Sequence, residues 1–443
     1  MSGIRGIVGE SLTPSVVVEF ARAYGTLLEG GRVVLGRDSR VSGEMFACAA
    51  AAGLTAAGCE VTQLGIAMTP TVAHAICTGH YDGGIVITAS HNPGQWNGMK
   101  VLDERGLAPD PSRAERLAAI RDQGEYRDVR DSFAPLQIDD QAGERHVEAV
   151  RAAVECDLRP LDGMRVVLDS VNGAGGIDSG AFLTSFGCDL VQINDEPTGL
   201  FAHGPEPIAE NLTQLCDAVR SARAAVGFVQ DPDADRLAVV DENGVFIGEE
   251  YTLALAVHSV LSRRPGPIAA NLSTSRMIDD IAGDFGMRVF RTPVGEAHVA
   301  RAVLEHECVL GGEGNGGVID PRISPVRDSL SAMSHILQLM AATGKSISAL
   351  VAEMPRYTMI KQKFDCPRAK IETALRAVAA ARSDIGGPDG RINDADGLRI
   401  DTPKGWVHIR ASNTEPIVRI MAEAADASEC EALIGRVRTA AGM

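Results

Sequence analysis

Three aspartates stand at alternate positions in one short segment, DPDADR, at residues 231 to 236. Asp231, Asp233 and Asp235 directly follow AVGFV, an apolar run typical of a buried strand. Carboxylate oxygens are ligands that suit Mg²⁺, an extended backbone would put alternate side chains on one face, and Pro232 disfavours a helix. The segment therefore predicts a magnesium site at the end of a strand. A solvated acidic turn is the alternative, and the frame of a calcium EF-hand is missing.

A serine and a histidine are neighbours in TASHNP, residues 88 to 93, which follows the apolar run GGIVI. We expect Ser90 to be accessible at the end of this strand, and Pro93 ends the strand. His91 is poorly placed as a base for Ser90, because neighbouring side chains on an extended chain point in opposite directions. The chain also lacks the GxSxG turn of many serine hydrolases. The segment is either a nucleophile loop or a capped structural turn.

RASNTEP, residues 410 to 416, combines cationic and hydroxyl side chains in one turn between two expected strands. Guanidinium groups, hydroxyls and backbone amides together suit a phosphate group, and this is not a Walker loop. A polar hairpin with surface arginines is the alternative. The residues concerned, including one on the following strand, are Arg410, Ser412, Asn413, Thr414 and Arg419.

GEGNGG, residues 312 to 317, is rich in glycine but lacks the GxGxxG spacing of a dinucleotide-binding loop. Glycines let a backbone approach a ligand closely, and Glu313 and Asn315 offer groups that hydrogen-bond sugar hydroxyls. A turn that merely requires positive φ is the alternative.

Three similar stretches of the chain each contain a β-rich run, a helical segment and a second β-rich run, which predicts parallel βαβ units. A further strand follows in each stretch and ends in one of the polar loops described above, at residues 83–93, 224–236 and 307–317. Ligands bind beyond the carboxyl ends of such strands, so the three loops could converge on one cleft. After Pro355 the pattern predicts a smaller α+β domain with an antiparallel meander. The predicted domains are 1–150, 151–248, 249–354 and 355–443.

The composition narrows the possible partners. The 443 residues carry a formal net charge of −17 without blocks of Lys or Arg, so we expect neither nucleic acid nor an anionic membrane as a partner. The first residues do not resemble a secretory signal, and no stretch approaches 18 uninterrupted apolar residues. Nine cysteines without a CxxC pair favour reduced thiols. The chain is expected to be cytoplasmic.

Together TASHNP, NGMK at residues 97 to 100, DPDADR, GEGNGG and RASNTEP, in this order, resemble the α-D-phosphohexomutase superfamily over essentially the whole chain. The resemblance implies three similar α/β domains with mixed or parallel sheets and a smaller C-terminal α+β domain around a central cleft. It implies phosphoserine at Ser90, Mg²⁺ on the three aspartates, and a fourth-domain loop that binds substrate phosphate. Phosphoserine would phosphorylate a sugar hydroxyl, and the bisphosphate would reorient and return its other phosphate, so that hexose 6-phosphate and hexose 1-phosphate interconvert.

The resemblance also implies roles for several cations. Arg5 of GIRG, Lys100 of NGMK and Arg236 would neutralise charge on the phosphate, and Lys100 or Arg5 would assist proton transfer. His91 is included among the candidate catalytic residues. The expected cofactors are Mg²⁺ and a hexose 1,6-bisphosphate, the partner is a small sugar phosphate, and the chain is expected to be a monomer or homodimer.

The chain departs from many bacterial relatives in the third domain, where they carry two histidines. Glu296 and Gly317 stand at those positions, and His298 is read as an ordinary loop histidine. TPVGE and GEGNGG look most like archaeal members, and Glu313 beside Glu296 would favour the ammonium group of glucosamine phosphate. The alternatives are a phosphomannomutase or phosphoglucomutase, a catalytically silent phosphosugar-binding protein, and a metal-dependent phosphatase.

Overall fold

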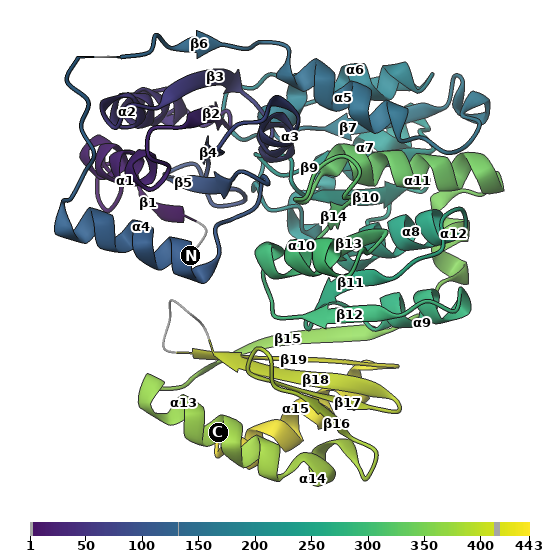
Figure 1. Cartoon of the computed structure of the whole chain (residues 1–443). Helices are drawn as coiled ribbons and strands as arrows, with labels where there is room; N and C mark the ends of the chain where they lie inside the picture. Colours follow the sequence, from purple (N-terminus) through teal and green to yellow (C-terminus); the bar gives the residue numbers. More distant parts are fainter. Residues whose placement is uncertain (1–2, 132, 412–416) are drawn as a thin grey trace. The chain divides into compact units, whose positions relative to one another are not determined.

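The computed structural model describes residues 3–131, 133–411 and 417–443, and the chain forms two compact units (Figure 1). The first unit comprises Met1–Arg263 and Asn315–Ala352, and the second comprises Arg264–Gly314 and Glu353–Met443. The predicted fold class is confirmed, because α/β domains with mixed sheets are followed by a C-terminal domain with an antiparallel sheet.

The first domain contains a six-stranded mixed sheet in the order β1-β5-β4-β2-β3-β6. Strand β2 is parallel to β3 and β4, whereas β5 is antiparallel to β1 and β4. Side chains alternate between the two faces of β2, so Val33 and Leu35 pack with α1 and α2 while Val34 packs with α3. The elements are β1 (Gly3–Ile7), α1 (Pro14–Leu27), β2 (Arg32–Arg37), α2 (Gly43–Ala56), β3 (Glu60–Ile66), α3 (Thr69–Gly79), β4 (Gly83–Ile87), β5 (Trp96–Asp103), α4 (Pro111–Gln123) and β6 (Gln137–Ile138).

The second domain repeats this pattern with four strands in the order β10-β9-β7-β8. Strand β7 is parallel to β8 and β9, and β10 returns antiparallel to β9. Its elements are η1 (Arg159–Leu161), β7 (Arg165–Asp169), η2 (Ala174–Gly176), α6 (Ser179–Ser185), β8 (Asp189–Ile193), η3 (Ala209–Asn211), α7 (Thr213–Ala222), β9 (Val226–Gln230) and β10 (Leu237–Asp241).

Buried helices complete the first unit. Helix α11 begins after Asp328, whose carboxylate accepts hydrogen bonds from the N–H groups of Leu330 and Ser331 and thereby caps the helix. Nine of the thirteen residues of α8 and all of the first twelve residues of α11 are buried, and the two helices pack together. The remaining elements are α5 (Ala142–Ala152), α8 (Glu249–Leu261), β14 (Gly317–Ile319), α11 (Ser329–Thr343) and α12 (Ile347–Glu353).

The second unit contains the parallel strands β12, β11 and β13 and a separate antiparallel sheet in the order β15-β19-β18-β17-β16. The predicted meander is confirmed by β16 to β19, and β15 adds to it by pairing with β19. Its elements are β11 (Ile268–Asn271), α9 (Met277–Asp284), β12 (Val289–Thr292), α10 (Glu296–Glu305), β13 (Leu310–Glu313), β15 (Thr358–Asp365), α13 (Arg368–Ala380), α14 (Arg382–Gly386), β16 (Arg391–Asn393), β17 (Leu398–Thr402), β18 (Gly405–Ala411), β19 (Ile417–Ala424) and α15 (Ala427–Ala441).

Two further observations concern the helices and the cysteines. None of the helices in the described ranges is long and apolar enough to cross a bilayer. All nine cysteines are free thiols, as the spacing predicted.

Candidate active site

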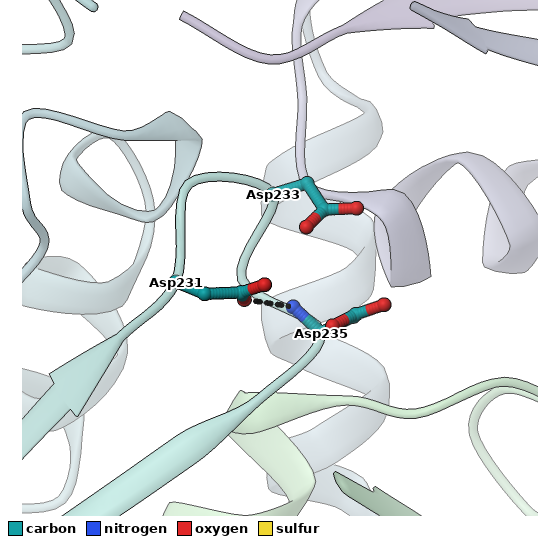
Figure 2. Close-up of side chains that lie close together, drawn as sticks. All are labelled: Asp231, Asp233 and Asp235. Atoms are coloured by element: carbon teal, nitrogen blue, oxygen red, sulfur yellow. Dashed lines mark hydrogen bonds between the residues drawn. The ribbon is translucent and has the colours of Figure 1, made fainter. Parts of the chain in front are cut away.

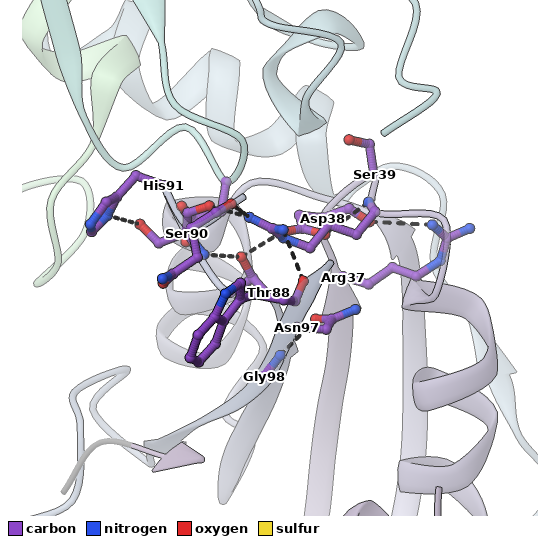
Figure 3. Close-up of polar contacts among 12 residues, drawn as sticks. Arg37, Asp38, Ser39, Thr88, Ser90, His91, Asn97 and Gly98 are labelled. Atoms are coloured by element: carbon purple, nitrogen blue, oxygen red, sulfur yellow. Dashed lines mark hydrogen bonds and ion pairs between the residues drawn. The ribbon is translucent and has the colours of Figure 1, made fainter. Parts of the chain in front are cut away.

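Ser90 lies in a tight turn just beyond β4 (Figure 3). Its φ is 51°, a left-handed conformation that non-glycine residues rarely adopt, and its N–H donates a 2.9 Å hydrogen bond to Thr88 Oγ1. The side chain is only 1% exposed, so the prediction of an accessible serine is wrong. The reason is that Ser90 Oγ donates a 2.9 Å hydrogen bond to Asp231 Oδ2 of the second domain, which covers it.

A buried arginine holds the Ser90 turn. Arg40 is 1% exposed, and its Nε donates a 3.0 Å hydrogen bond to Asp38 Oδ2, which also accepts from Thr88 Oγ1 at 2.6 Å. The two terminal nitrogens of Arg40 donate to four backbone carbonyls of the turn at 2.6 to 2.9 Å. These carbonyls belong to Ser90, Asn92, Pro93 and Trp96. The guanidinium group therefore fixes the backbone from Ser90 to Trp96.

We expect Arg40→Met to lower the free energy of unfolding by about 3 to 5 kcal/mol, because it leaves the buried Asp38 without its cation. Arg376→Met is the control. Arg376 also pairs with a carboxylate, that of Glu372, but both side chains are more than three-quarters exposed, so about 1 kcal/mol or less should be lost. Urea unfolding of the full chain measures both, and equal losses would show that Arg40 does not hold the turn.

His91 lies closer to the serine than the sequence predicted. Because the turn departs from an extended backbone at Ser90, His91 Nδ1 is 3.4 Å from Ser90 Oγ, and the prediction that the two side chains point apart is wrong. Burial, then the charges of Arg236 and Arg5, lower the pKa of His91 to about 3. The ring is therefore neutral at ordinary pH and is a weak base, which agrees with the expectation that it does not activate Ser90.

The aspartate segment is a tight turn between β9 and β10, as the predicted loop at the end of a strand required, but its backbone is not extended throughout (Figure 2). Ala234 has a φ of 54°, and its N–H donates a 2.9 Å hydrogen bond to the carbonyl of Asp231. The turn still brings the three side chains together, because ligand oxygens of Asp231, Asp233 and Asp235 lie within 4.8 Å of one another. All three side chains are fully buried.

Protein donors engage at least one oxygen of each aspartate of the turn and define its orientation. Asp231 Oδ1 accepts from the N–H groups of Asp235 and Arg236, both at 3.1 Å. Asp233 Oδ2 accepts from Thr69 Oγ1 and Lys100 Nζ, both at 2.6 Å. Asp235 Oδ2 accepts from Arg327 at 2.6 Å, and Lys100 lies 3.4 Å from it.

The other oxygens of Asp233 and Asp235 fit a metal. Within the described part of the chain, Oδ1 of each is buried and has no hydrogen-bond partner. Buried carboxylate oxygens are costly unless they are paired or coordinate a metal. Two such oxygens within one turn, beside the oxygen of Asp231 that Ser90 contacts, therefore constitute a candidate metal site.

The charges around these carboxylates differ from one aspartate to the next. Burial, then repulsion from Asp235 and Asp233, raises the pKa of Asp231 well above its usual range. Burial opposes ionisation of the other two as well, but Lys100 and Thr69 lower the pKa of Asp233, and Arg327 lowers that of Asp235. The turn thus holds ionised carboxylates in a buried place because cations from other segments surround them.

The predicted cations of the first unit lie around this cluster. Lys100, on β5, reaches the aspartates directly, and Arg5, on β1, donates a 3.1 Å hydrogen bond to Asn92 Oδ1 in the Ser90 turn. Arg236 is largely buried, and its guanidinium group lies 3.9 Å from both Asp235 Oδ1 and Glu206 Oε1. A buried hydroxyl, three carboxylates and several cations therefore meet, which suits the transfer of a phosphoryl group.

The remaining predicted residues are described within their own units. Glu313 in the second unit is 4% exposed and accepts hydrogen bonds from Asn271 Nδ2 at 2.7 Å and from the N–H of Gly295 at 3.1 Å. Asn315 in the first unit is half-buried. Arg410 and Arg419 face each other on β18 and β19. Ser412, Asn413 and Thr414 lie outside the described residues.

Several residues around the cluster were not identified from the sequence. Asp38 and Arg40 follow β2, whose carboxyl end lies beside that of β4, so GRDSR carried a usable signal: two charged residues at the end of an apolar strand. Thr69, at the start of α3, and Arg327, just before α11, carried no comparable signal, because nothing in the sequence indicates which distant carboxylate each contacts.

Comparison with known proteins identifies the family. Models of the phosphoglucomutase/phosphomannomutase alpha/beta/alpha domains I, II and III match residues 1–128, 144–244 and 248–357, and the model of the C-terminal domain matches 359–440. A probable phosphoglucosamine mutase of Methanopyrus kandleri is 37% identical over 425 residues, which are 96% of this chain and 93% of that protein. The chain belongs to the phosphoglucomutase/phosphomannomutase family. The predicted membership of the phosphohexomutase superfamily, a group of intramolecular phosphotransferases, is thereby confirmed.

A further relative and two solved structures resemble the chain to different degrees. A phosphoglucomutase/phosphomannomutase of Thermococcus kodakarensis is 39% identical over 436 residues, 95% of this chain and 93% of that one. The structure of a family protein from Burkholderia thailandensis has a TM-score of 0.87 and 28% identity, and covers 100% of this chain and 96% of its own. An Aspergillus fumigatus N-acetylphosphoglucosamine mutase in complex with GlcNAc-6P and magnesium shares the fold at 16% identity and a TM-score of 0.59, with 100% and 95% covered.

Proposed function

We propose that this chain interconverts hexose 6-phosphates and hexose 1-phosphates, and that Ser90 carries the transferred phosphoryl group. The observation that supports this most strongly is the 2.9 Å hydrogen bond from Ser90 Oγ to Asp231 Oδ2. It joins the nucleophile turn of the first domain to the acidic turn of the second, and a phosphoryl group on that oxygen would lie next to the proposed metal ligands.

We propose Mg²⁺ as the metal, held by Asp231, Asp233, Asp235 and the phosphate on Ser90. Carboxylate and phosphate oxygens are the ligands this ion prefers, and the family relative from Aspergillus fumigatus was solved with magnesium. When bound, the ion would polarise the phosphoryl oxygens and neutralise charge that develops as the group is transferred.

The protein's own side chains would position the nucleophile, transfer protons and bind the phosphate. Arg40 keeps the Ser90 turn in one conformation, so the oxygen does not move between donation and recovery of the phosphoryl group. Lys100 reaches the same cluster and would move a proton to or from the sugar oxygen, a role shared with Arg5. Arg236 would bind phosphate oxygens, and His91 would contact the substrate as a neutral ring.

Residues of the second unit and the neighbouring Asn315 would recognise the sugar phosphate. We propose that Glu313 and Asn315 contact sugar hydroxyls, and that the RASNTEP segment binds the phosphate that is not reacting. Arg410 and Arg419 are suited to this, because they occupy opposite positions on adjacent strands and can form bidentate contacts with phosphate. Ser412, Asn413 and Thr414, which lie outside the described residues, would supply the hydroxyl and amide groups of the same segment.

The reaction would begin with Ser90 already phosphorylated. Phosphoserine donates its phosphoryl group to the free hydroxyl of the substrate. The resulting hexose 1,6-bisphosphate then reorients within the site, so that its other phosphate faces Ser90. Its other phosphate then returns to Ser90, and the isomer is released. Added hexose 1,6-bisphosphate would act as an activator by phosphorylating Ser90 of an unphosphorylated chain.

Glucosamine phosphate is our first choice of sugar. Relatives from Methanopyrus kandleri and Thermococcus kodakarensis are named probable phosphoglucosamine mutases, although another relative from the second organism is named phosphoglucomutase/phosphomannomutase. Glu313 and Glu296 were expected to favour an ammonium group. Oε1 of Glu313 accepts hydrogen bonds from Asn271 Nδ2 and the N–H of Gly295, which fix the orientation of this carboxylate.

A side-by-side assay of glucosamine 6-phosphate, glucose 1-phosphate and mannose 1-phosphate tests this choice. With Mg²⁺ and the matching bisphosphate present, we expect all three to be converted and glucosamine 6-phosphate to have the highest kcat/KM. A higher value for glucose or mannose phosphate would overturn the choice of sugar but not the reaction. Steady release of inorganic phosphate without any isomer would instead indicate a phosphatase, and binding without turnover would indicate a silent sugar-phosphate receptor.

A further inference from the structure

Arg327 contacts the metal turn from a distant part of the chain. It lies between β14 and α11, and its Nη2 donates a 2.6 Å hydrogen bond to Asp235 Oδ2. Arg327 is 7% exposed and Asp235 is fully buried, so solvent does not weaken this contact as it would a surface ion pair. Two residues further on, Ser329 Oγ donates a 2.7 Å hydrogen bond to the carbonyl of Ala234 in the same turn. The start of α11 therefore supports the turn at two points.

A glycine provides the space that Arg327 occupies. A Cβ atom on Gly317 would lie 2.1 Å from Cδ of Arg327 and 2.8 Å from its Cγ, both far inside normal contact distance. These atoms belong to the middle of the side chain, so a small rotation of the guanidinium group would not relieve the overlap. Arg327 can reach Asp235 along this path because residue 317 has no side chain.

The contact determines how many oxygens Asp235 can offer to a metal. Arg327 engages Oδ2, and Oδ1 is buried without a hydrogen-bond partner among the described residues. Asp233 is arranged in the same way, since Thr69 and Lys100 engage its Oδ2. In this arrangement each of the two aspartates has one oxygen left for a cation.

We propose that Arg327 is a specificity-determining residue that favours magnesium over calcium by keeping Asp235 a ligand through a single oxygen. This rests on the proposed function, which places a divalent cation at the three aspartates. Calcium takes six to eight oxygen ligands and often binds both oxygens of a carboxylate, whereas magnesium takes six and retains several waters. A site whose carboxylates each offer one oxygen therefore lacks ligands that calcium needs.

Charge must be separated from geometry in any test. Removing a buried cation beside the site would strengthen the binding of every divalent cation, whatever Arg327 does to the ligands. The ratio of the calcium and magnesium dissociation constants cancels this common effect to a first approximation, because both ions carry the same charge. The ratio is therefore the quantity to measure.

Isothermal titration of the full-length chain with MgCl₂ and with CaCl₂ gives this ratio, with every protein matched for phosphorylation of Ser90 by intact mass. Arg327→Met removes both the charge and the contact, and we expect its preference to shift about tenfold towards calcium. Gly317→Ala keeps every charge but displaces Arg327, so we expect a shift in the same direction. Arg236→Met removes a cation that approaches Asp235 no closer than 3.9 Å, and its ratio should stay at the wild-type value.

The titrations test the role of Arg327 separately from the existence of the metal site. The proposal would be overturned if the ratio of the calcium and magnesium dissociation constants were the same in Arg327→Met and in Arg236→Met. If Arg327→Met does not fold, an unchanged ratio in Gly317→Ala would overturn it. If the wild-type chain binds neither ion, the metal site of the proposed function is wrong. If it binds both and the ratios do not move, only the role of Arg327 is wrong.

Discussion

Replacing Ser90 with alanine should reduce kcat for sugar-phosphate isomerisation by roughly 10⁴-fold or more. The reason is that the proposed reaction passes through a covalent phosphoserine, and among the described residues Ser90 Oγ is the hydroxyl that hydrogen-bonds to Asp231. Alanine removes one buried oxygen and leaves the backbone hydrogen bonds of the Arg40 contact in place, so the chain should remain folded.

A coupled assay of isomer formation measures this loss, and intact-mass spectrometry should show one phosphate on the wild-type chain and none on Ser90→Ala. Ser112→Ala is the matched control, because this exposed serine of α4 contacts Asp110 and lies outside the proposed site. It should retain wild-type turnover and the phosphate. Substantial turnover by Ser90→Ala would remove phosphoserine from the mechanism.

Asp233→Asn should lower kcat by roughly 10² to 10⁴-fold, since a bound metal supplies several kcal/mol of charge stabilisation. The substitution removes a charge from the proposed metal site, and it deprives Lys100 of the carboxylate that its ammonium group contacts at 2.6 Å. Because the amide is nearly the same size as the carboxylate, the turn should keep its shape.

Steady-state kinetics with increasing MgCl₂ distinguish the two consequences. If Asp233 holds the metal, the variant should need more magnesium for half-maximal activity, and EDTA should abolish wild-type activity reversibly. Asp128→Asn, which removes a half-exposed carboxylate paired with Arg22, should change neither property. A variant with normal magnesium dependence but reduced kcat would show that Asp233 acts through its contact with Lys100 and does not hold the metal.

The position of the candidate site could be predicted because the ends of strands can be recognised in the sequence. GGIVI and AVGFV are apolar runs that end in polar loops, and in each of the two sheets a ligand is expected beyond the carboxyl ends of the parallel strands. Both runs are strands, and their loops meet at Ser90 and Asp231. The antiparallel C-terminal sheet was predictable for a similar reason, since short runs separated by tight turns leave room only for hairpins.

The shape of the loops could not be predicted, because two residues depart from the expected backbone. Ser90 and Ala234 both have positive φ, so neither loop continues as an extended strand. These conformations persist because distant side chains hold them: Arg40 is 50 positions from Ser90, and Arg327 is 92 positions from Asp235. Propensity and alternation describe neighbours in the sequence and carry no information about such partners.

The two hairpins of the first unit have the same construction. In both domains a strand leaves a parallel pair, forms a polar turn and returns antiparallel, β4 to β5 in the first and β9 to β10 in the second. One turn carries the nucleophile and the other carries the carboxylates. A substitution in either turn can therefore alter one half of the site while the strands that present the other half remain unchanged.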